Sequence, residues 1–305
     1  KPQTPNPKPQ TPNPKPLYLY YSLVSRMIGK TTTNVGGYKT PGYATVEGTF
    51  KYSQRKAGQI NPDAFGKTHS GLTLSKLGLG SYIGDTSSEH DRLMFEAVLS
   101  CVHSGGVNVL DTAINYRSMK SEKAFGAAIK QLLSEGYSRE EFFVSTKGGY
   151  LSDDADRPDF SQNQLNKLLS QRKISPEDIV DDCHCMHPAF IEEMINTSLD
   201  NLQLETVDLY YLHNPAESQL SVIGEAAFLQ KTAKAFEMLE MKRKEGKIRS
   251  YGIATWGCFR APPTDQGNHL SLEKVVQIAK QVGGNDHGFR YIQLPINGLM
   301  MEAAE

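Results

Sequence analysis

Short apolar runs along the chain each end in a single polar residue. Runs of this length, bounded by polar residues, are typical of buried strands. A charge at the end of a buried strand needs a partner, so packing alone explains these polar residues poorly. The runs and the residues that end them are 107–110 with Asp111, 142–146 with Lys147 and 207–212 with His213.

Segments of helical periodicity alternate with these strands. Ser87 and Glu89 can cap a first helix, which Gly105 and Gly106 end. Residues 150–186 form a long, polar excursion, and long loops in compact domains are often functional. The alternation predicts a parallel sheet. The expected strands are 77–82, 107–110, 142–146, 207–212, 248–254 and 291–296, and the later helices are 122–134, a helix opening at Pro188, 225–244 and 272–282.

Asp111, Lys147 and His213 are expected to lie close together. In a parallel α/β barrel the carboxyl ends of all strands meet on one face, where active sites are built. Tyr116 follows Asp111 by five residues in a segment too polar to continue the strand. The pattern therefore places a carboxylate, an ammonium, an imidazole and a phenol at one site.

Several motifs occur in a characteristic order. They are Asp-Thr-Ala-x-x-Tyr at 111–116, Ser121-Glu122, Gly126, Thr146-Lys147 and Asp-Leu-Tyr-Tyr-Leu-His-Asn-Pro at 208–215. In this order they resemble the aldo-keto reductase family over roughly residues 72–297. The resemblance implies an α/β fold, the TIM-type (β/α)8 barrel, that reduces carbonyls with NADPH. It also implies that Asp111, Tyr116, Lys147 and His213 are catalytic.

These residue types suit carbonyl reduction. Tyr116 can donate the proton, and a nearby ammonium, Lys147, is expected to lower its pKa. Asp111 supplies a counter-charge for Lys147, and His213 can orient the substrate oxygen. Each residue alone has a structural interpretation, as an ion pair for Asp111 and Lys147 or as a satisfied core histidine. Their combination favours the functional interpretation.

Cofactor contacts are expected at three positions. The resemblance implies that Gln293 in the sixth strand hydrogen-bonds the nicotinamide carboxamide. Where the family has Gly-x-Ser-Asn, this chain has Gly-Ile-Ala-Thr, which leaves Thr255 as the only hydroxyl there. Asn214 is the third candidate. Trp256 is a candidate wall of the substrate pocket. No G-x-G-x-x-G fingerprint supports a Rossmann alternative.

The two ends of the chain depart from a simple barrel. Residues 1–16 repeat Lys-Pro-Gln-Thr-Pro-Asn-Pro, and proline at this density disfavours helix and sheet. We expect residues 1–64 to be a disordered or non-native extension, with the barrel over 65–305. The sequence supplies about six β/α units, so we expect the barrel to be truncated and poorly able to close.

Composition limits the possible partners. The 305 residues carry a net charge of −1, which suggests neither a nucleic-acid nor a membrane partner. The four cysteines suit a reducing compartment, so a cytoplasmic location is favoured. A weakly transit-like segment at 17–46 leaves a plastid as the alternative. The run Cys183 to His187 contains possible metal ligands, but its alternation on one loop disfavours a zinc site.

The leading hypothesis is an oxidoreductase that transfers a hydride between NADPH and a small aldehyde or ketone. Two alternatives stay open: a non-catalytic regulatory or binding subunit on the same barrel, and an inactive truncated product. The sequence determines neither the substrate, nor the choice between NADP and NAD, nor the oligomeric state.

Overall fold

A computed structural model describes residues 38–265 and 267–303. The repeat at residues 1–16 and the transit-like residues up to 37 lie outside the described residues. None of the helices in the described part of the chain has the length and apolar composition needed to cross a bilayer.

The described residues contain a six-stranded sheet in which every pair of neighbouring strands is parallel. Its spatial order, β10-β9-β8-β5-β4-β3, follows the order of the chain, because the strands numbered β6 and β7 form a separate hairpin. This arrangement confirms the parallel sheet predicted from the alternation of strands and helices. The strands are β3 (Leu79–Gly80), β4 (Val109–Asp111), β5 (Phe143–Gly148), β8 (Val207–His213), β9 (Ile248–Ala254) and β10 (Phe289–Gln293).

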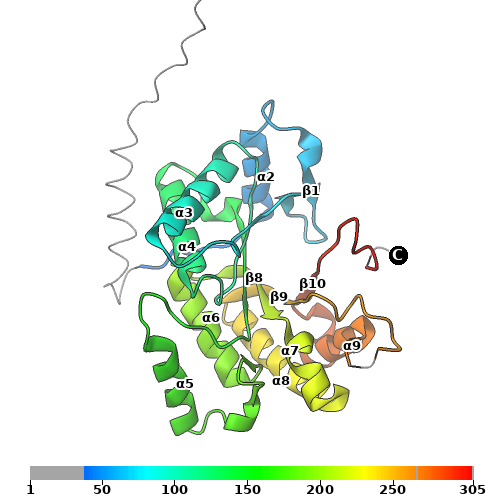
Figure 1. Ribbon diagram of the computed structural model, residues 1–305. Helices are drawn as coiled ribbons and strands as arrows, with labels where there is room; N and C mark the ends of the chain where they lie inside the picture. The colour runs from blue at the N-terminus through cyan, green and yellow to red at the C-terminus, as the bar shows by residue number, and fades with distance from the viewer. Residues whose placement is uncertain (1–37, 266, 304–305) are drawn as a thin grey trace, which may run out of the picture. The chain divides into compact units, whose positions relative to one another are not determined.

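Helices connect the strands and pack against one another in chain order. α3 contacts α4, α4 contacts α6, α6 contacts α8, and α8 contacts α9 (Figure 1). At one of these contacts Gly126 has no room for a side chain, because a Cβ would lie 2.7 Å from the Leu202 carbonyl oxygen. The helices are α3 (Ser88–His103), α4 (Lys120–Ser134), α5 (Phe160–Ser170), α6 (Pro188–Leu202), α7 (Pro215–Ile223), α8 (Glu225–Lys244) and α9 (Leu272–Gly283).

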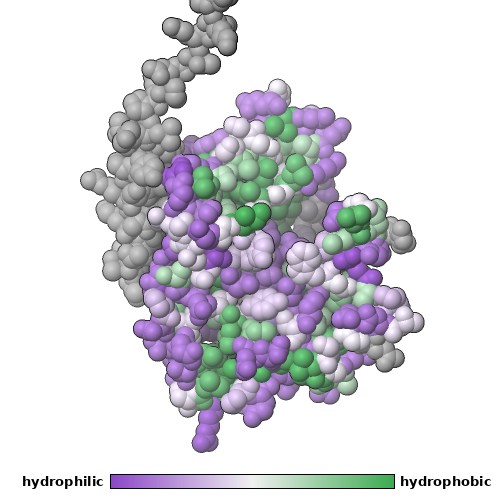
Figure 2. Space-filling view, in the orientation of Figure 1, coloured by the Kyte–Doolittle hydropathy of each residue, from purple (hydrophilic) through white to green (hydrophobic). Residues whose placement is uncertain are grey.

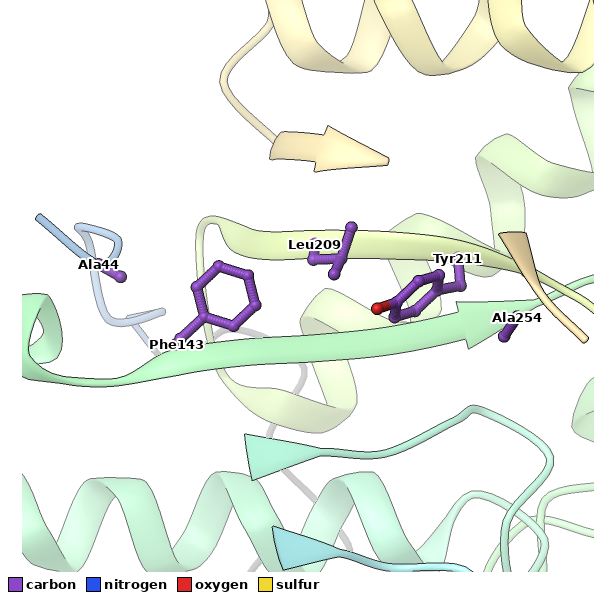
Figure 3. Close-up of a cluster of buried hydrophobic side chains, with 5 residues drawn as sticks. All are labelled: Ala44, Phe143, Leu209, Tyr211 and Ala254. Atoms are coloured by element: carbon purple, nitrogen blue, oxygen red, sulfur yellow. The ribbon is translucent and has the colours of Figure 1, made fainter. Parts of the chain in front are cut away.

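One face of the sheet encloses an apolar cluster. Because strand side chains alternate between faces, every second residue of each strand points to the same side. Figure 3 shows Ala44 beside Phe143 at one end of the cluster and Ala254 near Tyr211 at the other. Partly buried side chains from β4 and β10 complete it. The next residues on this face toward the carboxyl ends are polar, so the strands deliver functional side chains directly above a packed core.

Residues 38–64 belong to the described fold, so these residues before the expected start at Phe65 are not a disordered extension. They contain α2 (Val46–Arg55), capped by the Thr45 side chain. The Ala44 amide donates to Asp208 Oδ1 at 2.6 Å, and Asp208 also pairs with Arg139. These buried partners hold the segment at the amino ends of the strands, where the hairpin of β1 (Phe65–Lys67) and β2 (Thr73–Ser75) also lies.

Several boundaries differ from expectation. The sixth strand begins at Phe289 rather than Tyr291. α7 was not expected, because its nine residues directly follow a strand and contain little apolar periodicity. The excursion at 150–186 is structured as well, since it contains α5 and the antiparallel pair β6 (Ile179–Val180) and β7 (His184–Cys185).

On the face seen in Figure 2, hydrophobic residues lie in groups separated by hydrophilic ones.

Candidate active site

Asp111 and Lys147 form an ion pair at the carboxyl ends of neighbouring strands. Lys147 Nζ lies 2.6 Å from Asp111 Oδ2 and 2.8 Å from the Thr112 carbonyl oxygen. The Lys147 side chain is only 1% exposed. Burial lowers the pKa of Lys147, because it penalises the ammonium, and the Asp111 carboxylate opposes this shift. The Lys147 amine is therefore held by Asp111 and the Thr112 carbonyl oxygen rather than by solvent.

Two further side chains fix the Asp111 carboxylate. Ser145 Oγ donates to Asp111 Oδ1 at 2.5 Å, and Gln293 Nε2 donates to Asp111 Oδ2 at 3.2 Å. Ser145 was not expected at the site from the sequence. The signal was its position two residues before Lys147, which puts both side chains on the same face of β5. Gln293, expected at the cofactor, lies within the same hydrogen-bonded group.

Tyr116 lies over this ion pair in the turn that follows β4. Lys147 Nζ is 5.0 Å from the centre of the Tyr116 ring, a distance at which cation–π attraction operates. The ring also meets two others edge to face, Tyr82 at 5.1 Å and His213 at 5.6 Å between centroids. The structure thus brings the four expected catalytic residues together.

The pKa of Tyr116 is shifted upward. Burial is the main cause, and the nearby Asp111 carboxylate adds to it, because both disfavour the phenolate. We expected Lys147 to lower this pKa, but burial and the Asp111 carboxylate make the net shift upward. Asp111 lies 2.6 Å from the ammonium and offsets much of its charge. Tyr116 consequently keeps its proton at neutral pH.

His213 ends β8 in a buried position beside Tyr116. Its Nδ1 lies 3.2 Å from Asn115 Oδ1, and the Tyr150 ring meets it edge to face at 5.2 Å. Burial lowers the pKa of His213 to about 3, and the Lys147 cation contributes to the shift. The imidazole is therefore neutral, with one protonated nitrogen. Asn115 and Tyr150 were not expected at the site from the sequence.

Asn214 and Thr255 lie on the loops next to this group. Asn214 has a left-handed backbone with φ of 45°, and its Nδ2 donates to the Tyr150 hydroxyl at 3.3 Å. The Thr255 hydroxyl contacts the Glu217 carboxylate, which also accepts the backbone N–H of Trp256 at 2.9 Å. These hydrogen bonds join residues that directly follow β8 and β9. The Trp256 side chain is 62% exposed.

The Cys183–His187 stretch does not assemble a metal centre among the residues that the structure describes. Within residues 38–265 and 267–303, no group of three His, Cys, Asp or Glu side chains could hold a metal ion. His184 is instead fully buried, and its Nε2 lies 2.8 Å from the His213 carbonyl oxygen.

The fold and the site together define an α/β protein with a polar constellation at the carboxyl ends of parallel strands. Its sequence matches the model of the Aldo/keto reductase family over residues 76–261. The chain belongs to this family. The predicted fold class, a TIM-type (β/α)8 barrel with about six β/α units in this chain, is confirmed by the family and by the six parallel strands.

The chain is similar to two curated relatives and to one solved structure. The chain is 28% identical to the NADH-specific methylglyoxal reductase of Escherichia coli (strain K12), over 60% of this chain and 49% of the relative. It is 30% identical to a D-threo-aldose 1-dehydrogenase of Pseudomonas sp, over 61% and 51%. An aldo-keto reductase structure from Bacillus halodurans matches at 26% identity with a TM-score of 0.41, covering 61% and 48%. The chain spans about half the length of the curated relatives it matches.

Proposed function

We propose that this protein reduces a small aldehyde or ketone with NADPH and catalyses the reverse oxidation of the alcohol. Tyr116 donates the proton, assisted by Lys147, Asp111 and His213. The observation that carries the proposal is the ion pair of the buried Lys147 with Asp111, 2.6 Å apart, beneath the Tyr116 ring.

Carbonyl reduction adds a hydride to carbon and a proton to oxygen. The nicotinamide supplies the hydride when it is bound, since no side chain can do so. The Tyr116 phenol supplies the proton and becomes a phenolate, which is reprotonated from solvent after the alcohol leaves. Its raised pKa keeps the proton in place at neutral pH until the carbonyl oxygen gains negative charge.

Lys147 and Asp111 affect the negative charge that forms on Tyr116 when it gives up its proton. When the proton leaves Tyr116, the ammonium 5.0 Å from the ring centre offsets the new negative charge. Burial lowers the pKa of Lys147, and the Asp111 carboxylate opposes that shift and so favours the ammonium form. The Ser145 hydroxyl and the Gln293 amide satisfy the remaining carboxylate acceptors, so Asp111 stays fixed and does not compete for the substrate.

His213 orients the carbonyl oxygen. Its neutral imidazole stands edge-on to Tyr116 at 5.6 Å, so both groups border the same space. The hydrogen bond partner on Nδ1 decides which nitrogen carries the proton. If the Asn115 amide presents its nitrogen to Nδ1, the Nε2–H is left to donate to the substrate oxygen. Asn115 Oδ1 faces Nδ1 in this structure, so the proposal requires a half-turn of that amide about its Cβ–Cγ bond.

The side chains at the strand ends fit a nicotinamide carboxamide. That group has one acceptor oxygen and one donor nitrogen, and the amides of Gln293 and Asn214 offer both functions. The Thr255 hydroxyl is the third candidate contact. Gln293 is already hydrogen-bonded to Asp111. A carboxamide bound at Gln293 would therefore lie close to Tyr116, and the nicotinamide ring with it. NADPH is proposed over NADH, although the Escherichia coli relative is NADH-specific by name.

The test is to measure cofactor binding and turnover on the same protein. NADPH and NADH are titrated by fluorescence quenching, and loss of reduced-cofactor absorbance is then followed with a panel of small aldehydes and ketones. NADPH binding with turnover that Tyr116→Phe abolishes supports the proposal. Binding without turnover on any carbonyl supports the alternative of a binding subunit, and tighter binding of NADH overturns the cofactor assignment.

A further inference from the structure

The excursion between β5 and α6 returns to the active site through one histidine. β7 pairs back onto the residues that follow β5, since the Cys185 amide donates to the Gly149 carbonyl at 2.8 Å and His184 forms a bridge with Tyr150. The β6–β7 hairpin also packs on α7, the helix that begins directly after His213 and Asn214. The excursion is therefore tied to β5 on one side and to the end of β8 on the other.

His184 holds the backbone of His213. Its Nε2 donates to the His213 carbonyl oxygen at 2.8 Å, and its Nδ1 accepts from Gln219 Nε2 at 2.8 Å. A carbonyl oxygen can only accept, so the contact fixes which nitrogen of His184 carries the proton. Both nitrogens of the His184 ring therefore have hydrogen-bond partners, and the residue is fully buried. A buried polar ring with two defined partners has little freedom to move.

Tyr150 adds a second contact to the same residue. Its ring meets His184 at 5.1 Å and His213 at 5.2 Å, each with an interplanar angle of 84°. Its hydroxyl receives hydrogen bonds from Asn214 and Ser218, both at 3.3 Å. The side chain of His213 is thus packed by Tyr150, while its carbonyl is held by His184.

Gly149 makes this arrangement possible. Its φ of 138° lies in a region that side chains rarely adopt, and a Cβ there would sit 2.5 Å from His184 Nε2. The imidazole of His184 occupies the space that any larger residue at position 149 would need. Gly149 therefore has two roles. It allows the backbone conformation of this turn, and it leaves space for the His184 ring.

We propose that His184 is a positioning residue for His213, through which the 150–186 excursion sets the orientation of the imidazole at the substrate. This inference rests on the proposed function, because it assigns a consequence to the placement of His213. The proposed mechanism does not use the Nε2 proton of His184. A displacement of about 1 Å at a reacting group can cost about 100-fold in rate, so a residue outside the reacting group can control turnover.

The experiment compares two substitutions of His184 with a control on the same segment. His184→Phe keeps a ring but removes both hydrogen bonds, whereas His184→Gln keeps an N–H that can reach the His213 carbonyl. His187→Asn is the control, because His187 caps α6 through its side chain and asparagine is a good capping residue. We expect His184→Phe to lower kcat about 10-fold or more with NADPH affinity unchanged. His184→Gln should recover most of that loss, and His187→Asn should match the unaltered protein.

A double-mutant cycle separates positioning from general stability. If His184 acts through His213, then His184→Phe should cost nothing further in a His213→Ala background. An equal loss of kcat in both backgrounds overturns the inference. Gly149→Ala, which pushes the imidazole without removing it, should reproduce the loss if His184→Phe does not fold.

A readout without turnover keeps the inference separate from the proposed function. The imidazole nitrogen signals of His213, followed by NMR, should shift in His184→Phe and stay unchanged in His187→Asn. If the unaltered protein reduces no carbonyl, the proposed function fails while this measurement still decides whether His184 positions His213. Unchanged His213 signals in His184→Phe would refute the inference whatever the activity.

Discussion

Gln293 and Asp111 touch across the sheet, although their strands are not neighbours. Gln293 Nε2 lies 3.2 Å from Asp111 Oδ2, while β9, β8 and β5 separate β10 from β4 in the sheet order. A flat sheet with strands about 4.8 Å apart would hold these residues far beyond contact. The Phe143 and Tyr291 rings meet at 5.7 Å in the same way, from β5 and β10. The sheet is therefore curved so that one face closes on itself, and this curvature gathers the site.

Tyr116→Phe tests the proton donor. Only the hydroxyl is removed, so the ring contacts with Tyr82 and His213 remain. Loss of general-acid catalysis should lower carbonyl reduction by about 100- to 10,000-fold, with NADPH affinity nearly unchanged. Steady-state kinetics and cofactor titration measure the two effects separately.

Tyr82→Phe is the matched control for that variant. Tyr82 packs against the same ring but is 72% exposed, and loss of its hydroxyl should leave turnover within about threefold, because exposed substitutions have small effects. Wild-type turnover in Tyr116→Phe would remove Tyr116 from the mechanism.

Lys147→Met tests the buried ion pair. The substitution leaves the Asp111 carboxylate beside a methionine. A fully buried charge that loses its partner costs about 3 kcal/mol of stability, and because Asp111 is 19% exposed the loss here should be smaller. It should also raise the pKa of Tyr116 further, because the cation near its ring is gone. Urea unfolding measures the first effect, and the pH profile of alcohol oxidation in any residually active variant measures the second. The double variant Asp111→Asn with Lys147→Met should regain part of the stability, and a double variant as unstable as the single one would argue against direct pairing.

Two buried histidines predict how stability depends on pH. Burial lowers the pKa of His184 to about 4 and that of His213 to about 3, below the usual 6.5. Between these values the unfolded chain binds more protons than the folded chain, so the free energy of unfolding rises with pH and falls as acid is added. Each histidine contributes at most about 1.4 kcal/mol per pH unit. Urea unfolding at a series of pH values should show a shallower slope for His184→Gln than for the unaltered protein, and parallel slopes would contradict this account.

The sequence predicted the strands that carry the site because each ends abruptly in a polar residue. Asp111, Lys147 and His213 lie close together because their strands are parallel neighbours, whose carboxyl ends meet at the same edge of the sheet. Asn115 and His184 gave no comparable signal, because their contacts with His213 join residues 98 and 29 positions apart. The helix at 46–55 was not expected, because the contacts that hold it are made with residues far away in the sequence. Its Tyr52 hydroxyl, for example, reaches the Val102 and Val107 carbonyls.

Asn115→Asp tests how the His213 imidazole is held. A carboxylate at position 115 favours the charged imidazolium, so the pKa of His213 should rise from about 3 toward the neutral range. Below the raised pKa the His213 ring of the variant would carry two N–H donors, whereas the neutral ring carries one. Titration of the His213 ring signals by NMR measures the shift. Asn115→Ser, which introduces no charge, should leave the pKa low, and a low pKa in Asn115→Asp as well would show that the two side chains do not interact in solution.

Tyr52→Phe tests whether residues 38–64 are part of the folded domain. The Tyr52 side chain is fully buried, and its hydroxyl lies 2.8 Å from the Val102 carbonyl oxygen and 2.9 Å from that of Val107. One hydroxyl hydrogen is shared between these two acceptors, so its removal leaves buried carbonyls without a partner. That loss should lower the free energy of unfolding by about 1–3 kcal/mol. The measurement is urea unfolding, followed by circular dichroism.

Ser53→Ala provides the control for this last variant. Ser53 lies next to Tyr52 in α2, but its hydroxyl donates only to the exposed Phe50 carbonyl within the same helix, at 2.7 Å. It should change stability by no more than about 0.5 kcal/mol. Turnover should be unchanged in both variants at temperatures where they are folded, because α2 lies at the amino ends of the strands and the site lies at their carboxyl ends. If Tyr52→Phe is as stable as the unaltered protein, α2 contributes nothing to the folded core, and the start expected at Phe65 describes the stable domain better than the start found here.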